Sequence, residues 1–127
     1  MRVTFGLIAH NNPTTIRTRL YRDLLPTLAH YPHGEFEIVI VDNSANEDRD
    51  LHRIDDPVQI RYQWNDDENL QYSYAMNQLV ELARHPHFVY LCATHGRMFD
   101  PTWLLDILAP LNNPTVGMCG SVVGSIE

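Results

Sequence analysis

Residues 35–48 read Glu-Phe-Glu-Ile-Val-Ile-Val-Asp-Asn-Ser-Ala-Asn-Glu-Asp, and this stretch decides the fold. The run from Phe36 to Val41 is short, apolar and rich in β-branched residues, which is typical of a strand that is buried on both faces. Asp42 stands where the strand must end, because the Asn, Ser and acidic residues after it favour tight turns. The sequence therefore predicts a carboxylate at the carboxyl end of a central strand, the edge at which open parallel sheets bind ligands.

Strands and helices alternate along the rest of the chain. Further strands are predicted at Arg2–Ala9, Val58–Trp64, Phe88–Ala93 and Thr115–Val123, of which the second alternates in polarity like a strand near a sheet edge. Helices are predicted after Asn12-Pro13, over Leu70–Arg84 and after Asp100-Pro101. Pro26 is expected to kink or end the first helix early. Residues 1–127 are thus expected to form one α/β domain, a three-layer α/β/α arrangement around a mostly parallel, Rossmann-like sheet.

Four polar segments follow the predicted strands. Right-handed crossovers place the loops after parallel strands on one edge of the sheet. The loops expected to converge there are His10–Asn12, Asp42–Asn46, Asn65–Asn69 and Thr94–Arg97. A polar crevice at this edge is the expected ligand site.

Composition excludes several classes of protein. The formal net charge is -7, with 16 acidic residues against 9 Lys and Arg and no basic face, which argues against a nucleic-acid partner. No apolar run approaches the ~20 residues of a membrane span. Cys92 and Cys119 lie in apolar runs, which predicts buried thiols in a reducing compartment and hence a cytoplasmic protein. The absence of Gly-x-Gly-x-x-Gly and P-loop motifs excludes two common nucleotide sites.

Four segments, in chain order, resemble the nucleotide-binding half of family-2 glycosyltransferases, transferases of the GT-A fold. Val-Thr-Phe-Gly-Leu-Ile-Ala-His-Asn-Asn (3–12) is similar to the family's opening strand and Tyr-Asn turn, and Ile-Val-Ile-Val-Asp-Asn-Ser (38–44) to the strand end whose Asp reads the nucleobase. Glu-Asn-Leu-Gln-Tyr-Ser-Tyr-Ala-Met-Asn (68–77) is similar to Glu-Asn-x-Gly…Ala-x-Asn, with Gln71 in place of Gly. Asp-Pro-Thr-Trp-Leu (100–104) resembles the Pro-x-Trp-Leu that follows the family's metal loop.

The resemblance implies an inverting enzyme that moves a sugar from a nucleotide-diphosphate donor, here of the UDP type, to an acceptor hydroxyl of a glycan or another molecule. The implied nucleotide-binding residues are His10, Asn11, Asp42, Asn43, Ser44, Asn69 and Asn77. Four of these residues also have a structural interpretation. Asp42 and Asn11 suit turns, Asn69 suits a helix cap and Asn77 suits a hydrogen-bonded amide in the core.

The metal loop departs from the family pattern. Its Asp-x-Asp falls on Thr94-His95-Gly96, which carries no carboxylate, and imidazole is softer than the ligands that Mg²⁺ prefers. No metal ligand, Mg²⁺ or Mn²⁺ cofactor is therefore assigned. Arg97 is a candidate to pair with phosphate in place of a metal, and its alternative interpretation is a surface charge. Asp66, Asp67 and Glu68 are interpreted as a solvated face, with an alternative metal cluster as the second reading.

Two functions remain open on the sequence. The first is a glycosyltransferase-like domain, part of an enzyme. The second is a non-catalytic binding or interaction domain that kept a degenerate GT-A fold without the Asp-x-Asp loop. The family's acceptor site and catalytic base follow the matched segments, so the catalytic residues are unknown. The domain is expected to be truncated at its C-terminus and inactive alone. It is also expected to self-associate, or to bind a C-terminal partner region, through Val122, Val123 and Ile126.

Overall fold

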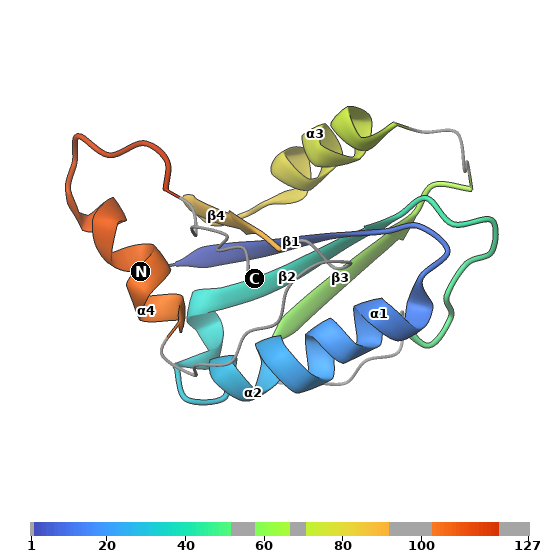
Figure 1. Ribbon diagram of the computed structural model, residues 1–127, viewed down its shortest axis with the longest axis horizontal. Helices are drawn as coiled ribbons and strands as arrows, with labels where there is room; N and C mark the ends of the chain where they lie inside the picture. Colours follow the sequence, from blue (N-terminus) through green and yellow to red (C-terminus); the bar gives the residue numbers. More distant parts are fainter. Residues whose placement is uncertain (1, 52–57, 67–70, 92–102, 120–127) are drawn as a thin grey trace, which may run out of the picture. The chain divides into compact units, whose positions relative to one another are not determined.

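The computed structural model describes residues 2–51, 58–66, 71–91 and 103–119. The chain divides into two compact units, Met1–Gly96 and Arg97–Glu127. The first unit contains a four-stranded sheet in the order β3-β2-β1-β4 in which every neighbouring pair is parallel (Figure 1). Its strands are β1 (Val3–Ala9), β2 (Phe36–Asp42), β3 (Gln59–Trp64) and β4 (His87–Tyr90).

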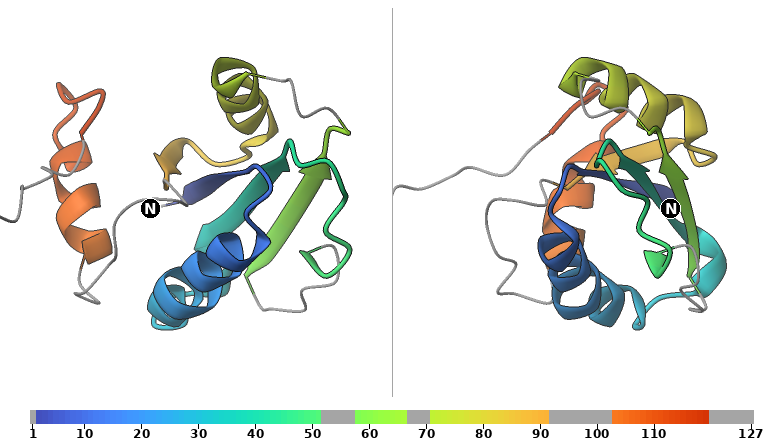
Figure 2. Two further views of the ribbon diagram at one scale, coloured as in Figure 1. Left: turned by 45° about the vertical axis from the view of Figure 1, so that its right-hand side comes forward. Right: turned by 90° about the vertical axis from the view of Figure 1, so that its right-hand side faces the viewer.

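Helices cover both faces of this sheet. One face carries α1 (Pro13–Thr18), the π-helix η1 (Arg19–Leu24) and α2 (Leu25–Leu28), and a short 3-10 turn, η2 (His33–Glu35), leads into β2. The other face carries α3 (Tyr72–Leu82) (Figures 1 and 2). The predicted α/β class, with a parallel sheet between helical layers, is confirmed.

Side-chain alternation along β2 fills the two cores. Val39 and Val41 pack with Ala75 and Leu79 of α3. The alternate residues of β2 point to the opposite face, where the first helical segment supplies an unbroken row of fully buried side chains. That row consists of Ile16, Leu20, Leu24 and Leu28, the i, i+4 series predicted from the sequence. β2 is therefore buried on both faces along its whole length, as predicted.

Pro26 does not end the first helix early. The chain stays helical to Leu28, but its winding changes to a π-helix over Arg19–Leu24, where the Leu25 N–H bonds the Leu20 carbonyl five residues back. Pro26 then lies in the first turn of α2, a position at which a missing N–H costs little. A change of helical winding thus accommodates the proline.

Other element boundaries differ in detail from the predictions. β3 lies at the sheet edge, as predicted. The predicted last strand is wrong over residues 115–119, which form a turn and irregular chain, and its remainder lies outside the described residues. Within the second unit, α4 (Trp103–Leu108) continues into the 3-10 helix η4 (Ala109–Asn112).

The structure tests in part the predictions that both cysteines are buried thiols and that the chain has no membrane span. Cys119 is a free thiol that is half-buried rather than buried, and its Sγ lies 3.0 Å from the carbonyl oxygen of Ile107. Cys92 lies outside the described residues. Across the ranges that the structure describes, no helix has both the length and the apolar character that crossing a bilayer requires.

A buried carboxylate, Glu37, joins the sheet to the end of α3. Glu37 is 1% exposed, and its Oε1 accepts hydrogen bonds of 2.6 Å from the Thr4 hydroxyl and the Arg84 N–H. Its Oε2 accepts from Arg61 at 3.2 Å, and Arg61 also donates to the carbonyl of Leu82. Burial alone would raise the pKa of Glu37, but these donors and the Arg61 charge outweigh it, so the pKa lies below its usual range.

Replacing Glu37→Gln should lower the free energy of unfolding by about 3 kcal/mol, because Arg61 would lose its charged partner. Urea unfolding followed by tryptophan fluorescence measures this, with exposed Glu81→Gln on α3 as the matched control. A carboxyl whose pKa is lowered by folding stabilises the fold above its unfolded value of about 4.3, and that contribution disappears as the pH falls through the folded pKa. The gap between parent and Glu37→Gln should therefore narrow below about pH 4. Equal stability of the parent and Glu37→Gln near neutral pH would contradict a stabilising role for the Glu37 charge.

Candidate functional site

The loops after β1 and β2 are hydrogen-bonded to each other at the carboxyl edge of the sheet. The Asn43 N–H donates to the Ala9 carbonyl at 2.9 Å, and the Asn11 N–H donates to Ser44 Oγ at 2.7 Å. In return, Asn11 Oδ1 accepts from the Ala45 N–H at 3.1 Å. Three of the predicted site residues, Asn11, Asn43 and Ser44, thus meet as expected. Asn69 and the loop Thr94–Arg97 lie outside the described residues.

Asparagines determine the shape of the turn after β1. Asn11 has a φ of 52°, in the left-handed region that Asn tolerates better than most residues. Asn12 occupies the N-cap position of α1, as predicted, but its side chain makes no capping bond. Its Oδ1 instead accepts from the His10 N–H at 2.8 Å. His10 is exposed on this turn.

Asp42 ends β2 as a buried carboxylate. It is 2% exposed, its Oδ1 accepts from the Ser44 N–H at 2.9 Å, and its Oδ2 accepts from the Tyr62 hydroxyl. The bond from the Ser44 N–H is the turn-forming interaction that was the structural interpretation of Asp42. Among the described residues, no Lys, Arg or His forms an ion pair with Asp42. Two neutral donors in the described part of the chain, the Ser44 N–H and the Tyr62 hydroxyl, thus hold the two oxygens of this buried carboxyl group.

Tyr62 of β3 bonds both strand-end segments. Its hydroxyl donates to Asp42 and accepts from the Asp48 N–H at 3.0 Å. Burial, together with the hydrogen bond to Asp42, raises the pKa of Tyr62 well above its usual range, so the phenol stays protonated. Two residues along the strand, the Trp64 indole N–H donates to the Ser44 carbonyl at 2.9 Å. β3 thereby fixes the Asp42 turn from one side.

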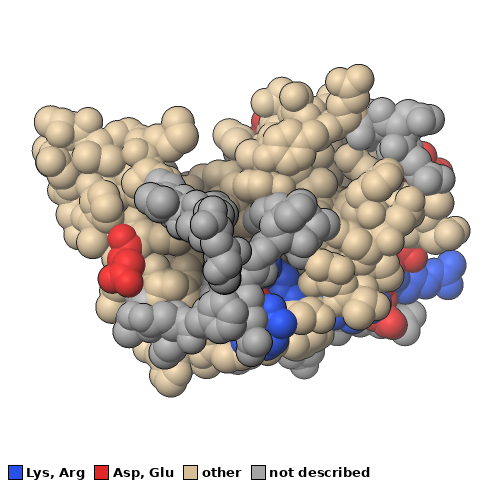
Figure 3. Space-filling view, in the orientation of Figure 1, with Lys and Arg blue, Asp and Glu red and all other residues tan. Residues whose placement is uncertain are grey.

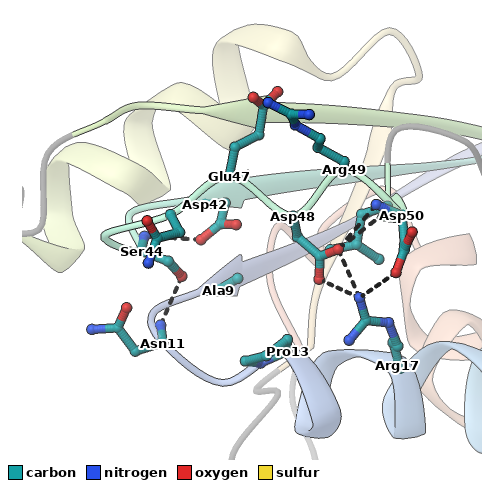
Figure 4. Close-up of a pocket in the computed structure, with 12 residues that line it drawn as sticks. Ala9, Asn11, Pro13, Arg17, Asp42, Ser44, Glu47, Asp48, Arg49 and Asp50 are labelled. Carbon is teal, nitrogen blue, oxygen red and sulfur yellow. Dashed lines mark hydrogen bonds and ion pairs between the residues drawn. The ribbon is translucent and has the colours of Figure 1, made fainter.

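Asp48 joins the loop after β2 to helix α1. Both of its carboxylate oxygens lie 2.7 Å from Arg17, and the Arg17 guanidinium is also 3.5 Å from Asp50 (Figure 4). Asp48 Oδ1 further accepts from the Asp50 and Leu51 N–H groups at 3.2 and 3.4 Å. Both bonds to Asp48 come from the same nitrogen, Nη2, so one charge-assisted contact ties this loop to α1.

These segments enclose a pocket with a volume of about 550 Å³, called here the Asp42 pocket. Its lining residues come from β1 and the turn after it, from α1, and from the end of β2 and the loop after β2. They are Ala9, Asn11, Pro13, Arg17, Asp42, Ser44, Asn46, Glu47, Asp48, Arg49, Asp50 and Leu51 (Figure 4). Acidic and basic side chains also gather at the right-hand side of the space-filling view, whereas the visible surface over α3 carries few charges (Figure 3).

The charges of the Asp42 pocket restrict what it can hold. Four carboxylates and two guanidinium groups line it, and Arg17 is already paired with Asp48 and Asp50. A phosphate group would meet repulsion from the carboxylates. A neutral ring or sugar that donates hydrogen bonds would find acceptors there. The geometry therefore favours an uncharged, donor-rich group of moderate size.

A network of amide side chains lies behind the pocket and was not predicted. The Asn65 Nδ2 donates to Asn43 Oδ1 at 2.6 Å and to Gln78 Oε1 at 2.7 Å, and its Oδ1 accepts from Gln78 at 3.0 Å and Gln63 at 3.1 Å. It ties α3 to the strand ends through Gln78. The neighbouring Asn77, predicted for the site, is exposed on α3. Its alternative reading as a core amide is wrong.

Other residues of the site were also missed in the sequence. Tyr62, Arg17 and Asp48 each come from a different element, and their roles depend on how those elements meet. The available signal was the parity of β3, since Tyr62 shares a strand face with Trp64. That pattern predicted a half-buried strand but could not reveal a hydroxyl aimed at Asp42.

Comparison with known proteins gives matches at the level of structure. Neither a protein-family model nor a curated protein matches this chain by sequence. The crystal structure of S. aureus TarS 1-349 matches with a TM-score of 0.66 and 17% identity, over 88% of this chain and 32% of that chain. The crystal structure of S. aureus TarS matches with a TM-score of 0.58 and 18% identity, over 73% of this chain and 16% of that chain.

TarS is a glycosyltransferase of the GT-A type. This chain spans about a third of the shorter TarS structure and about a sixth of the longer one. At these identities the likeness concerns the fold, and the sheet with its two helical layers extends over most of the chain. The comparison therefore shows that this chain has a GT-A-like fold.

Proposed function

We propose that this chain is a glycosyltransferase-like domain whose Asp42 pocket holds the base of a UDP-type sugar donor. The observation that carries the proposal is the environment of Asp42, a 2% exposed carboxylate that lines a pocket and is held by neutral donors. Burying a carboxylate that has no cationic partner among the described residues is costly. A ligand N–H that donates to it would form a charge-assisted hydrogen bond and offset part of that cost.

Uracil suits this pocket in three respects. Its N3–H is a donor that Asp42 can accept, since each carboxylate oxygen has capacity for a second bond. Its ring is uncharged, so the surplus of carboxylates does not repel it. Ala9, Pro13 and Leu51 add apolar lining for the ring, while acidic groups at the rim can accept from ribose hydroxyls. His10, Asn43, Asn69 and Asn77 remain proposed contacts around the nucleotide.

The diphosphate needs partners that the Asp42 pocket does not supply. We assign this role to Arg97, with Thr94, His95 and Gly96 beside the phosphates and sugar, all outside the described residues. A set made of one hydroxyl, one imidazole and a glycine does not fit the oxygen-rich coordination that Mg²⁺ requires. In the described part of the chain, no three His, Cys, Asp or Glu side chains are grouped to hold a metal. The proposed function therefore assigns no role to a divalent cation.

The proposed reaction is inverting glycosyl transfer. The bond between the sugar C1 and the diphosphate breaks, a C1–O bond to an acceptor hydroxyl forms, and the acceptor proton passes to a base. No residue of this chain is assigned as that base. The GT-A-like fold supports a transferase, whereas the carboxylate-free Thr94-His95-Gly96 favours the alternative, a non-catalytic nucleotide-binding domain. Both candidates use the Asp42 pocket, so nucleotide binding is the first test.

We expect the chain to bind UMP at least about tenfold more tightly than 3-methyl-UMP, because the methyl group removes the N–H that Asp42 would accept. Titration calorimetry with both ligands measures the ratio. Asp42→Asn should reduce the ratio toward one, and exposed Asp106→Asn on α4 is the matched control. Circular dichroism checks that each variant is folded. Equal affinity of the parent for both nucleotides would contradict the assignment of Asp42 to the base.

UDP binding should depend little on divalent cations. Adding EDTA is expected to change the dissociation constant by less than about twofold, since the Thr94–Gly96 segment offers no carboxylate. Calorimetry with and without the chelator decides this. A large loss of affinity would mean that another carboxylate, such as Asp66 or Asp67, supplies a metal site. Under our placement of the metal loop, Gly96→Asp should make UDP binding more dependent on Mn²⁺.

A further inference from the structure

A continuous series of polar contacts runs from helix α1 to the floor of the Asp42 pocket. Arg17 holds the Asp48 carboxylate by two bonds of 2.7 Å. The Asp48 N–H donates to the Tyr62 hydroxyl at 3.0 Å, and that hydroxyl donates to Asp42 Oδ2. Asp42 at the end of β2 and the backbone of the loop after it therefore meet at one phenol oxygen, which β3 contributes.

The two bonds at Tyr62 determine which way its proton points. Because the phenol oxygen accepts from Asp48, its O–H is directed toward Asp42 rather than toward the loop. Asp42 is gripped on its other oxygen by the Ser44 N–H at 2.9 Å. A carboxylate held at both oxygens cannot rotate freely about its terminal torsion, so its remaining lone pairs keep one direction relative to the pocket.

We propose that Tyr62 is a positioning residue for base recognition: it fixes the Asp42 carboxylate so that a free lone pair meets the donor edge of a pyrimidine ring. The inference rests on the proposed function and adds a residue to it. Tyr62 does not line the pocket itself, so its effect on the ligand passes through Asp42. A purely structural tyrosine would support both nucleotides equally.

The protonation of Tyr62 is consistent with this role. Burial and the neighbouring carboxylate raise the pKa of Tyr62 above its ordinary value of about 10. The donor is therefore present throughout the neutral and mildly alkaline range. Ionisation would place a phenolate against Asp42 and Asp48, which like-charge repulsion disfavours.

The test compares Tyr62→Phe, which keeps the ring and removes the hydroxyl, with Tyr21→Phe, which alters a tyrosine that is 53% exposed on η1. Calorimetry with UMP and 3-methyl-UMP gives two affinities for each protein. For Tyr62→Phe we expect UMP affinity to fall about tenfold and 3-methyl-UMP affinity to change by less than about twofold, because one positioning hydrogen bond is lost. Tyr21→Phe should match the parent in both.

A second measurement does not depend on that variant folding. The parent chain is labelled with 3-fluorotyrosine at position 62 and, separately, at position 21, and its ¹⁹F spectrum is recorded during titration. UMP should shift the signal at position 62 more than 3-methyl-UMP does, and neither ligand should shift the signal at position 21. An unchanged signal at position 62 on saturation with UMP would overturn the proposal.

The outcomes separate this inference from the function on which it rests. If the parent does not prefer UMP over 3-methyl-UMP, the proposed function fails and the role of Tyr62 fails with it. If the parent discriminates and Tyr62→Phe discriminates equally well, only the positioning role is overturned. If Tyr62→Phe loses both affinities by the same factor, Tyr62 is merely structural and the proposal is again wrong.

Discussion

The parallel pairing of β2 between β1 and β3 is the constraint on which the rest of this structure depends. Ala9, Asp42 and Trp64 lie in register at the carboxyl ends of the three strands. The loops that follow must therefore leave from one line, where their backbone groups bond each other. Because β2 is covered on both faces, its last side chain is buried before the chain can turn away. A carboxylate at that position has to find its partners inside the protein.

β2 carries two buried carboxylates, and their environments differ in a way that separates structure from function. Glu37, near the start of the strand, faces α3 and is bonded to Arg61, Thr4 and the Arg84 amide. Its charge is balanced, and it adjoins no described ligand pocket. Asp42, at the other end, faces the opposite side of the sheet and lines a pocket. Among the described residues Asp42 has no ionic partner, and it is this carboxylate of β2 that borders the pocket.

The charges that line the Asp42 pocket suggest that the two halves of the proposed sugar-nucleotide donor, its nucleoside and its diphosphate, bind to different parts of the chain. Carboxylates dominate the Asp42 pocket, and its Arg17 is committed to Asp48. That composition suits a base and ribose, while phosphate charge needs another set of groups. The segment that we match to the metal loop, Thr94-His95-Gly96, has no carboxylate, and the substitute that we propose is the side chain of Arg97. An arginine can donate two parallel hydrogen bonds to a phosphate, which neither a glycine side chain nor an imidazole can do.

The sequence by itself determined the fold class, the strand order of appearance and the position of the carboxylate. Periodicity was sufficient for these features. The apolar run Phe36–Val41 is buried completely as a strand, and the row from Ile16 to Leu28 is buried completely on one side of a helix. Prediction from periodicity was wrong in two places. The helix continued past Pro26, because π-helical winding accommodated the proline, and residues 115–119 formed no strand.

Only the tertiary structure decided how Asp42 is held. The Tyr62 hydroxyl, the Arg17–Asp48 pair and the amide network of Asn65 and Gln78 each join residues from different elements. No pattern in a single segment can encode such contacts, because they depend on strand register and on where helices cross the sheet. The packing also chose Gln78 over its neighbour Asn77, since one residue along a helix turns the side chain by about 100°. The sequence determined that a carboxylate lies at the carboxyl edge of the sheet. The tertiary structure determined the orientation of that carboxylate, because its hydrogen-bond partners Ser44 and Tyr62 come from the loop after β2 and from β3.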